Sequence, residues 1–583
     1  MSKYKGNFID PGNCAVFYLI GFFLLGIQSC KEDEPRAKNK KPVIYSFIAN
    51  PENITSGESV TLSWDVTGAE SVTIDNDIGA ITSVSYIVTP FNTTTYQLKA
   101  INKYGADSAS VTVFVSPDPN TLIVTVDESH VLNLKPRKLL GISYDARSSL
   151  DNGIGLSIGY HDIATGAMLA GLQPLWNKLP VTGVRYPGNP VVMNWNWKYT
   201  VGPIANRLPQ QLAPNSNNIL AFGFDEFMQM VLARGLTGAD IQIMVNIYPI
   251  SSESSAAQNA ADWVEYCNAP NDGNHPWAAQ RAANGREVPY NVRTWNIGNE
   301  PWSPSEFNFD ASKYIPLATP VIDAMRRIDP TIQITLPVVG NPNSAWNTAI
   351  LNASSFSGKF WGISPHFFYD EDPATGNPNI LQDETLLKSW EAVTLNKGLK
   401  IVIGDHAHDA PQSNPDKGFK WEGALSTANF LTMASQITNI ERANYWIYGS
   451  WLAQWHPIRR NNDGSFTFMA AAQVYEEFFP IMHDKSVLTS IKMIDGGMDS
   501  FVRASAFQTN DGKHLSIIVV NIDLSKTKKL ALPVVSGYSI AKASSLTGAL
   551  TDDNLTKSIV TLQSDNTYLL GKSCVLILEY LKE

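Results

Sequence analysis

Cysteine is scarce in this chain. Four cysteines occur in 583 residues, and two of them, Cys14 and Cys30, fall within the first thirty positions. The other two, Cys267 and Cys574, fall in different predicted domains, so a structural disulfide is not expected. Cys267 follows a helical pattern, and we expect it to be an inert buried thiol.

Positively charged residues are fewer than negatively charged ones. Lysine and arginine number 44 against 54 acidic residues, which gives a net charge of −10 and a pI near 5.5. This balance argues against a nucleic-acid groove and against an anionic membrane surface as the partner. The glycine-containing turns lack the spacing of a phosphate-binding loop, and no Ser-His-Asp order stands out. We therefore expect no cofactor.

The first 29 residues have the pattern of an export signal. Lys3 and Lys5 precede an uncharged run over residues 14–28, which is too short for a typical membrane span. The segment Ile27–Cys30 ends with a small residue before a cysteine and resembles a bacterial lipobox. This resemblance implies a lipoprotein signal peptide over residues 1–29. The alternative is an uncleaved anchor helix.

If that resemblance holds, Cys30 is the lipidated first residue of the mature protein. Residues 30–42 are charged and punctuated by proline, which predicts a flexible tether. Lys31–Glu34 resembles the acidic export tag of lipoproteins displayed by Bacteroidota. We therefore expect a lipid anchor to the membrane through Cys30, at the outer membrane or cell surface.

Residues 43–116 have a different pattern, in which short runs alternate between polar and apolar positions. Such runs, separated by turn residues, are typical of a β-sandwich. Trp64 is predicted to pack between the two sheets. The segment resembles the immunoglobulin-like spacer modules of bacterial surface proteins. We favour a spacer over a carbohydrate-binding module, because the aromatic residues are few and mostly inward by alternation.

From residue 138 to 485, strand-like runs alternate with helical ones, which predicts a (β/α)8 TIM barrel. Amphipathic stretches such as 225–234, 312–328 and 424–437 would supply the outer helices. The eight candidate barrel strands are Leu139–Tyr144, Gly183–Tyr186, Ile241–Asn246, Arg293–Gly298, Gln333–Val338, Trp361–Ser364, Ile401–Gly404 and Ala443–Ile447.

The last part of the chain returns to strand-type alternation. Residues 516–520 and 574–578 are apolar runs of this kind. Residues 486–583 are therefore predicted to form a C-terminal β-sandwich, which residues 120–137 join with one or more strands. The expected architecture is a multidomain chain, with the barrel flanked by two β-sandwiches.

The segment Trp295–Trp302 is the most informative candidate site. A short apolar run ends in Asn299 and Glu300, and Pro301 then blocks further regular pairing. TIM barrels carry their active sites at the carboxyl ends of the strands, where a partly desolvated carboxyl can hold a proton near neutral pH. Glu300 is therefore a catalytic candidate. The alternative is a surface carboxylate that only stabilises a loop.

Four stretches of the predicted barrel match a known family. They are Gly183–Asn189, Phe222–Phe227, Ala261–Asn268 and the ordered block from Trp277 to Glu300. In these stretches the chain resembles glycoside hydrolase family 51, whose best-known members are the α-L-arabinofuranosidases of clan A. The resemblance implies a glycoside hydrolase that acts through two carboxylates.

The resemblance also implies roles for individual residues. Glu300 would protonate the departing oxygen and then activate water, and Asn299 would bind the 2-hydroxyl of the sugar. Arg185 would orient the carboxylates, or would form an ion pair in the barrel floor instead. His366 matches the histidine that the family has on strand six. Tyr369 is a stand-in for the tyrosine that the family places one position earlier.

Strand seven departs from the family pattern. The run Lys400–Gly404 leads into Asp405 where the family has a glutamate nucleophile, and Glu422 lies too far along, in a predicted helix. Retaining enzymes hold their carboxyls about 5 Å apart, whereas inverting enzymes leave room for a water. Three outcomes stay open, in this order: Asp405 is the nucleophile, it is the base of an inverting variant, or the site binds sugar without cleaving it.

The acidic side chain at the end of strand one is also shorter than its counterpart in the family. The Gly-x-Phe-x-Glu of the family appears as Gly141–Asp145, so Asp145 takes the place of the residue that would clasp the terminal furanose. The two changes fit another furanose or a bulkier sugar at least as well as arabinofuranose. Asn246, Trp302 and Trp446 are further candidates for substrate contact, the two tryptophans by stacking on sugar faces.

The histidines beside Asp405 raise the alternative of a metal site. His406 and His408 with flanking aspartates could ligate zinc or iron. Strand alternation would place both histidines on the face opposite Asp405, which splits the ligand set. We therefore expect no metal.

Two classes of function follow from these patterns. The first is a glycoside hydrolase that cleaves a polysaccharide or oligosaccharide and is most similar to an α-L-arabinofuranosidase. Within this class, a hydrolase of a different furanoside or pyranoside, or an endo-glycanase, stays open. The second class is a non-catalytic surface glycan-binding lipoprotein. We favour the enzyme, because a site that binds sugar without cleaving it has no physical need for Asn299 and Glu300 together with a carboxylate on strand seven.

Overall fold

The computed structural model describes residues 40–583 apart from 77, 91, 150–158, 189–194, 211–217, 251–254, 305–306, 370–379, 409–414, 419, 449–454 and 563–565. By its contacts the chain divides into two compact units, Met1–Ser116 and Pro117–Glu583. Within the described residues, no helix combines the length and the apolar character that crossing a bilayer requires.

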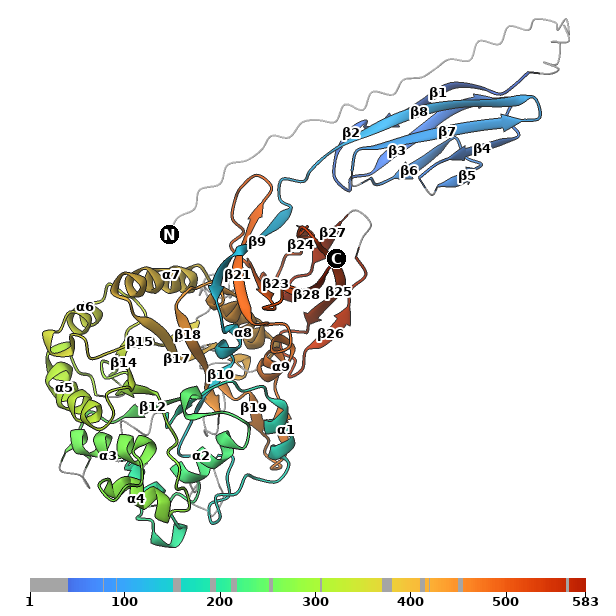
Figure 1. The fold of residues 1–583 in the computed structure, drawn as a ribbon. Coiled ribbons are helices and arrows are strands. Elements are labelled where there is room, and N and C mark those ends of the chain that lie inside the picture. Colours follow the sequence, from blue (N-terminus) through green and yellow to red (C-terminus); the bar gives the residue numbers. More distant parts are fainter. Residues whose placement is uncertain are drawn as a thin grey trace, which may run out of the picture. The chain divides into compact units, whose positions relative to one another are not determined.

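The first unit contains two β-sheets with a shared core (Figure 1). The smaller sheet has the strand order β1-β3-β6 and the larger one the order β2-β8-β7-β4-β5. Trp64 lies in the shared core and meets Phe47 edge to face, as the alternating pattern predicts. The strands are β1 Val43–Asn50, β2 Asn53–Thr55, β3 Val60–Thr67, β4 Ser71–Ile74, β5 Gly79–Ile81, β6 Ser85–Val88, β7 Thr94–Asn102 and β8 Gly105–Ser116.

Eight parallel strands of the second unit form a closed barrel, which confirms the predicted TIM-barrel fold. They are hydrogen-bonded in the order β15-β14-β13-β12-β11-β10-β18-β17, and pairing of β15 with β17 closes the ring. A short additional strand, β16 Phe367–Tyr369, pairs with β17. The barrel strands are β10 Gly141–Tyr144, β11 Val184–Tyr186, β12 Ile241–Val245, β13 Thr294–Ile297, β14 Gln333–Val338, β15 Gly362–Pro365, β17 Lys400–His408 and β18 Ile440–Tyr448.

Helices follow most of the barrel strands, and α3 to α6 lie outside the ring in Figure 1. Helix α5 illustrates why these segments are helical. Asp310 caps its first turn by accepting a hydrogen bond from the Lys313 amide at 2.9 Å, and Arg326 and Arg327 occupy its last turn, where the helix dipole favours positive charge. The α-helices are α1 Leu172–Lys178, α2 Phe224–Leu232, α3 Ala256–Asn268, α4 Pro276–Ala283, α5 Ala311–Ile328, α6 Ala345–Leu351, α7 Ile380–Lys397, α8 Trp421–Ala434 and α9 Ala470–Phe478.

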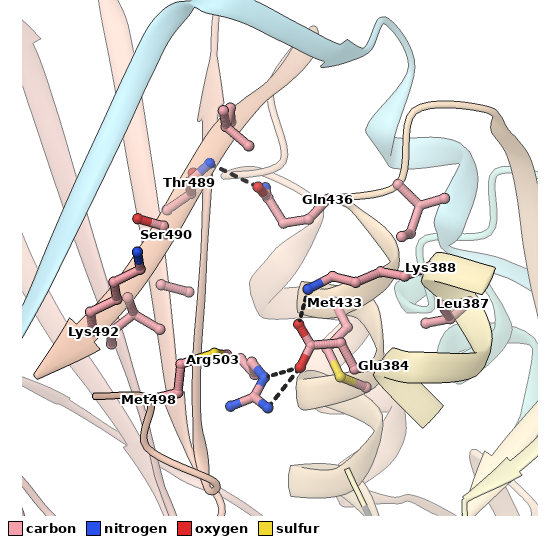
Figure 2. A pocket seen from close by; sticks show the side chains of 14 residues that line it. Glu384, Leu387, Lys388, Met433, Gln436, Thr489, Ser490, Lys492, Met498 and Arg503 are labelled. Atoms are coloured by element: carbon pink, nitrogen blue, oxygen red, sulfur yellow. Dashed lines mark hydrogen bonds and ion pairs between the residues drawn. The ribbon is translucent and has the colours of Figure 1, made fainter. Parts of the chain in front are cut away.

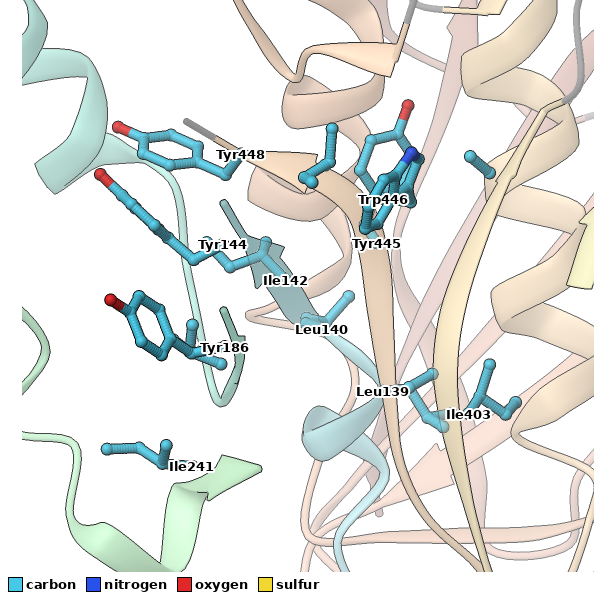
Figure 3. Packing of buried hydrophobic residues seen from close by; sticks show 14 of the residues in the cluster. Leu139, Leu140, Ile142, Tyr144, Tyr186, Ile241, Ile403, Tyr445, Trp446 and Tyr448 are labelled. Atoms are coloured by element: carbon cyan, nitrogen blue, oxygen red, sulfur yellow. The ribbon is translucent and has the colours of Figure 1, made fainter. Parts of the chain in front are cut away.

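Tightly packed aromatic side chains join the first, second and last barrel strands to their surroundings. Figure 3 shows Tyr144 of β10 and Tyr448 of β18 pointing the same way, and their ring centroids are 5.2 Å apart. Tyr186 of β11 stacks on Phe227 of α2 at 4.1 Å. Because these rings are fully buried, they fix the strands whose ends carry the candidate site.

The C-terminal strands are hydrogen-bonded into one nine-stranded sheet, in the order β26-β25-β28-β23-β22-β21-β9-β24-β27. Strand β9 Leu122–Asn133, from the segment predicted to join this region, pairs with β21. The other strands are β21 Lys485–Met493, β22 Val502–Gln508, β23 His514–Asn521, β24 Lys528–Ala531, β25 Tyr538–Thr547, β26 Thr556–Ile559, β27 Thr567–Leu570 and β28 Cys574–Lys582, and a hairpin of β19 Ile458–Arg460 and β20 Phe466–Phe468 precedes them.

The nine-stranded sheet packs against barrel helices α7 and α8. A cavity of about 310 Å³, lined by both apolar and polar side chains, lies between these helices and strands β21 and β22 (Figure 2). At its edge Arg503 donates to Glu384 at 2.8 Å, and the Thr489 amide donates to Gln436 at 2.8 Å. These contacts hold the sheet against the barrel, and the residues that line the cavity do not include Glu300 or Asp405.

Candidate active site

Asn299 and Glu300 follow β13 after one residue, Gly298, at the carboxyl end of the barrel strand. The chain turns there through Gly298 at φ 88°, and Glu300 also has a left-handed backbone at φ 34°. A non-glycine residue pays roughly 1–2 kcal/mol for this conformation. Strain of this kind collects at functional sites, where it fixes the direction of a side chain.

Arg185 of β11 connects the residues of the site. Its side chain has no exposed surface, and its Nη1 donates to Oδ2 of Asp405 at 2.7 Å. Its Nη2 donates to Oδ1 of Asn299 at 2.5 Å, and its Nη1 also lies 3.3 Å from the hydroxyl of Ser143. One buried guanidinium therefore fixes both the carboxylate of Asp405 and the amide orientation of Asn299.

His366 follows β15 and lies between the two candidate carboxylates. Its Nδ1 is 2.7 Å from Oε1 of Glu300 and 3.6 Å from Oδ2 of Asp405. The distance between Oε1 of Glu300 and Oδ2 of Asp405 cannot exceed the sum of these two distances. The two carboxylates therefore lie close enough together to act on one glycosidic bond.

Space for the imidazole ring comes from Gly404 of β17. A Cβ atom at this position would lie 2.6 Å from Nε2 of His366 and 2.7 Å from the hydroxyl of Ser364. Real Cβ atoms do not approach so closely, so a larger residue would displace the histidine. Gly404 thus keeps His366 next to Glu300 and Asp405.

The electrostatics of Glu300 differ from the sequence-based expectation. Burial raises its pKa, but the charge and hydrogen bond of His366, together with the charge of Arg185, outweigh burial and leave the pKa lowered. We expect from the sequence that the carboxyl of Glu300 holds a proton near neutral pH. This arrangement favours the ionised carboxylate instead. The sequence could not show that the histidine contacts this carboxylate directly.

Asp405 has one engaged and one open carboxylate oxygen. Its Oδ2 accepts from Arg185, whereas its Oδ1 is buried and has no hydrogen-bond partner among the residues that the structure describes. A buried oxygen without a partner is costly in a resting protein and is explained if a ligand or substrate approaches it.

Asp145 follows β10 and is fully buried, but its carboxylate is already engaged. The guanidinium of Arg147 donates to Oδ1 at 3.0 Å and to Oδ2 at 2.6 Å, and the Arg147 amide donates to Oδ1 at 2.8 Å. Both oxygens that could clasp a sugar hydroxyl therefore have a strong partner. This differs from the expected direct role of Asp145 in furanose binding.

Three further candidates lie near the strand ends. Asn246 follows β12 and accepts from the amide of Tyr248 at 3.2 Å. Trp302 is half-buried and meets Trp346 edge to face at 5.3 Å. Trp446 of β18 is almost fully buried, so packing accounts for most of its surface (Figure 3).

The placement of Tyr369 corrects its expected role. Its hydroxyl lies 3.0 Å from that of Thr427 on α8 and 3.3 Å from Nδ1 of His406, and its ring stacks on Phe430 of α8. Successive residues of a strand point to opposite faces, so Tyr369 points out toward α8 whereas its neighbour takes the other face. It therefore does not join the residues around Asp405.

The histidines after Asp405 are likewise directed outward. His406 stacks on Phe430 of α8 at 4.7 Å, and burial lowers its pKa to about 3. Strand alternation predicts this separation from Asp405. In the described part of the chain, no group of three or more histidine, cysteine, aspartate or glutamate side chains is arranged to hold a metal ion.

Sequence reasoning missed three residues that shape the site: Ser143, Arg147 and Gly404. Alternation along the first strand could have pointed to Ser143, since it occupies an inward position two residues before Asp145. Arg147 and Gly404 had no such signal. Their effects depend on which side chains meet across the barrel.

The barrel matches known α-L-arabinofuranosidases in sequence and in fold. The family model for the α-L-arabinofuranosidase 1 domain matches residues 168–372. An intracellular exo-α-(1→5)-L-arabinofuranosidase from Halalkalibacterium halodurans is 32% identical over 230 residues, which are 38% of this chain and 43% of the relative. A corresponding enzyme of Bacillus subtilis is 31% identical over 182 residues, which are 31% and 34% of the two chains.

The structure is similar to that of the family 51 α-L-arabinofuranosidase from Thermotoga petrophila, with a TM-score of 0.63 and 20% identity over 79% of this chain and 99% of the other. This chain spans less than half the length of the two curated relatives above. Together the matches confirm the predicted resemblance of the barrel to family 51.

The comparisons contradict the predicted location at the outer membrane or cell surface. Both curated relatives carry names that describe intracellular enzymes. The prediction depended on a short apolar run and on Ile27–Cys30, in which Ile27 and Gln28 are unusual for a lipobox. So short a pattern is weak evidence for the location of a protein in the cell. Cys30, the predicted lipidation site, lies outside the described residues.

Proposed function

We propose that this protein is a retaining glycoside hydrolase that releases L-arabinofuranosyl residues from an oligosaccharide or polysaccharide. The observation that carries the proposal is the pair of carboxylates, Glu300 and Asp405, which lie 2.7 and 3.6 Å from the same ring nitrogen of His366. Two carboxylates that can reach one glycosidic bond are the groups that a retaining glycosidase requires. The names of the curated relatives support exo attack on α-(1→5)-linked arabinofuranose.

In the proposed mechanism Asp405 is the nucleophile. Its Oδ1 attacks the anomeric carbon while Glu300 gives a proton to the departing glycosidic oxygen, so that one C–O bond forms as the other breaks. Glu300 then takes a proton from water, and the resulting hydroxide displaces Asp405. The sugar leaves with its original anomeric configuration.

The residues around the carboxylates support this chemistry by position. Arg185 holds Oδ2 of Asp405, and Oδ1 has no partner among the described residues. Arg185 also binds Oδ1 of Asn299, which leaves the amide NH₂ of that residue directed away from the guanidinium. An amide group in this orientation can donate to the 2-hydroxyl oxygen of a sugar, a contact that strengthens in the transition state.

The test is turnover of 4-nitrophenyl α-L-arabinofuranoside, with NMR of the first-formed sugar. We expect the α-anomer first, and we expect Asp405→Asn to abolish turnover. Glu300→Gln should lower turnover most for substrates with poor leaving groups. Asp511→Asn is a matched control, because Asp511 is an exposed carboxylate in a turn before β23. First release of the β-anomer, or full activity of Asp405→Asn, would exclude the mechanism.

A second substrate is favoured by one specific observation. Because Arg147 engages both oxygens of Asp145, the carboxylate expected to clasp arabinofuranose is occupied. A different furanoside or a pyranoside on the same barrel is therefore the runner-up. A panel of aryl glycosides separates the two, because kcat/KM should be highest for the sugar whose hydroxyls the site accepts. Binding of oligosaccharide without turnover of any glycoside would identify a glycan-binding protein instead.

We also propose a division of the chain by task. Residues 138–485 form the catalytic barrel, and residues 120–137 and 486–583 form a sheet domain that supports it. Residues 43–116 serve as an immunoglobulin-like spacer. In the sheet β1-β3-β6 and its partner sheet, the inward-facing position of Trp64 supports a packing role rather than sugar binding.

A further inference from the structure

A second pocket lies at the amino ends of the barrel strands, away from the carboxyl ends that carry Glu300. Arg293 directly precedes β13, whereas Glu300 follows the other end of the same strand. The pocket has a volume of about 260 Å³. Among the residues that line it, three are basic, Lys138, Arg293 and Arg442, and one is acidic, Glu441. The proposed hydrolysis makes no use of this concentration of positive charge.

The guanidinium of Arg442, near the start of β18, has unused hydrogen-bond donors. The residue is 3% exposed, and its Nη2 donates to the backbone carbonyl of Ala239 at 2.8 Å. Its Nε and Nη1 are buried and have no hydrogen-bond partner among the residues that the structure describes. A buried cation with unused donors is costly unless a ligand or an ordered water supplies the acceptors. This guanidinium is therefore the strongest indication of a binding site in the pocket.

The neighbouring carboxylates do not fully compensate the buried positive charge. Nζ of Lys138 lies 3.6 Å from Glu441 and 4.0 Å from Asp240. Burial lowers the pKa of Arg442 by more than the charges of Asp240 and Glu441 raise it. Burial, and after it the charge of Arg442, also leave the pKa of Lys138 lowered. An anion in the pocket would stabilise the charged forms of both side chains.

The position of the Arg442 guanidinium is fixed by the backbone around it. A Cβ atom at Gly183, which directly precedes β11, would lie 2.9 Å from Nε and 3.1 Å from Cζ of Arg442. The glycine therefore leaves the space that the guanidinium occupies. Arg293 supplies a second guanidinium, whose Nη1 donates to the hydroxyl of Thr331 at 2.8 Å. Because Asp329 offsets part of its charge, Arg293 contributes less to anion binding than Arg442.

We propose that this pocket binds a phosphate group, either free phosphate or the phosphate of a small metabolite, through Arg442 and Lys138. A guanidinium presents planar donors that match phosphate oxygens, and an ammonium adds a point charge. The volume is close to the lower end of the range for small-molecule sites, about 300 Å³. The inference does not rest on the proposed hydrolase function, because the two sites use different residues at opposite ends of the barrel.

The test is isothermal titration calorimetry of the full chain, with sodium phosphate and ribose 5-phosphate as separate ligands at constant ionic strength. We expect a Kd of about 1 mM or tighter for at least one of them. Arg442→Met should weaken binding by at least about tenfold, because it removes charge-assisted hydrogen bonds. Lys138→Met should weaken binding as well, and it tests the site independently if Arg442→Met does not fold. Tighter binding of ribose 5-phosphate would identify a metabolite as the ligand, and equal or tighter binding of phosphate would identify the free ion.

A matched control separates a specific site from a general loss of charge. Lys513→Met removes one positive charge from a side chain that is 73% exposed in the turn before β23, and it should leave the Kd unchanged. Absence of binding of either ligand to the wild type would overturn the inference. Undiminished binding by Arg442→Met or by Lys138→Met would overturn it too, and would leave that residue a purely structural role. None of these outcomes depends on turnover of a glycoside, so failure of the hydrolase proposal remains distinguishable.

Discussion

The buried pair of Arg185 and Asp405 should dominate the stability of the barrel site. Both side chains are almost completely buried, and the ion pair is 2.7 Å long. Arg185→Met removes the cation but leaves the carboxyl group of Asp405 in a site with little solvent. An unpaired buried charge of this kind costs about 3–5 kcal/mol. Asp405→Asn costs less, about 1.5–3 kcal/mol, because the amide oxygen can still accept from the guanidinium.

The double variant tests this reasoning most sharply. Arg185→Met with Asp405→Asn leaves neither charge buried, so its cost should fall below the sum of the single costs by about 1–3 kcal/mol. The assay is the free energy of unfolding in urea, followed by tryptophan fluorescence. All but Trp64 of the 15 tryptophans lie within residues 138–485, so the signal reports the barrel.

A second cycle supplies the control. Arg281 is another fully buried arginine, but its side chain donates to backbone carbonyls such as that of Tyr266 at 2.7 Å. Arg281→Met should therefore be additive with Asp405→Asn within about 0.5 kcal/mol. If Arg185→Met is equally additive, the two groups are not energetically paired, and the reasoning about the site is refuted.

Further predictions concern the backbone, the pH dependence and the packing of the site. Because Glu300 has φ 34°, Glu300→Gly should be more stable than Glu300→Ala by about 1 kcal/mol in urea denaturation; the usual order, with alanine more stable, would contradict the strain. The lowered pKa of Glu300 means that its ionised form stabilises the fold above the unfolded pKa of about 4.3. The deficit of Glu300→Gln relative to wild type should thus be complete at neutral pH and vanish as the pH falls through the lowered pKa, and a pH-independent deficit would refute this. Gly404→Ala should lower the free energy of unfolding by about 1–3 kcal/mol, displace His366 and lower kcat at least about tenfold. Gly340→Ala should change neither quantity, because a Cβ atom there would meet nothing closer than 3.8 Å. Equal effects of the two substitutions would contradict the packing argument.

The positions of the barrel strands could be predicted from the sequence because each contains a short, buried, apolar run, although β17 and β18 extend beyond that run at both ends. Thr294–Ile297 and Gln333–Val338 fall within or on the predicted ranges. The short strand Phe367–Tyr369 was not predicted, since three residues carry too little pattern to identify it. The single nine-stranded sheet also could not be foreseen, because alternation reveals which face of a strand is buried but not which strands pair.

The site was predictable where a side chain is placed by its own strand, and unpredictable where it is placed by a partner. Asn299, Glu300, Arg185, His366 and Asp405 lie together, as strand-end positions on one barrel predict. Tyr369 points away because one residue of strand alternation reverses its face. The engagement of Asp145 by Arg147 and the lowered pKa of Glu300 depend on contacts across the fold, which no local pattern contains.

The most direct test of the two-carboxylate mechanism is to trap and locate the covalent intermediate. Glu300→Gln is mixed with 2,4-dinitrophenyl α-L-arabinofuranoside, which can glycosylate the enzyme without an acid but leaves no base to remove the sugar. The proteolysed enzyme is then examined by mass spectrometry. The mechanism predicts one pentosyl group, attached to Asp405 in the peptide that contains residues 400–408. A sugar attached to another residue, or rapid turnover with no attached sugar and an inverted product, would contradict it.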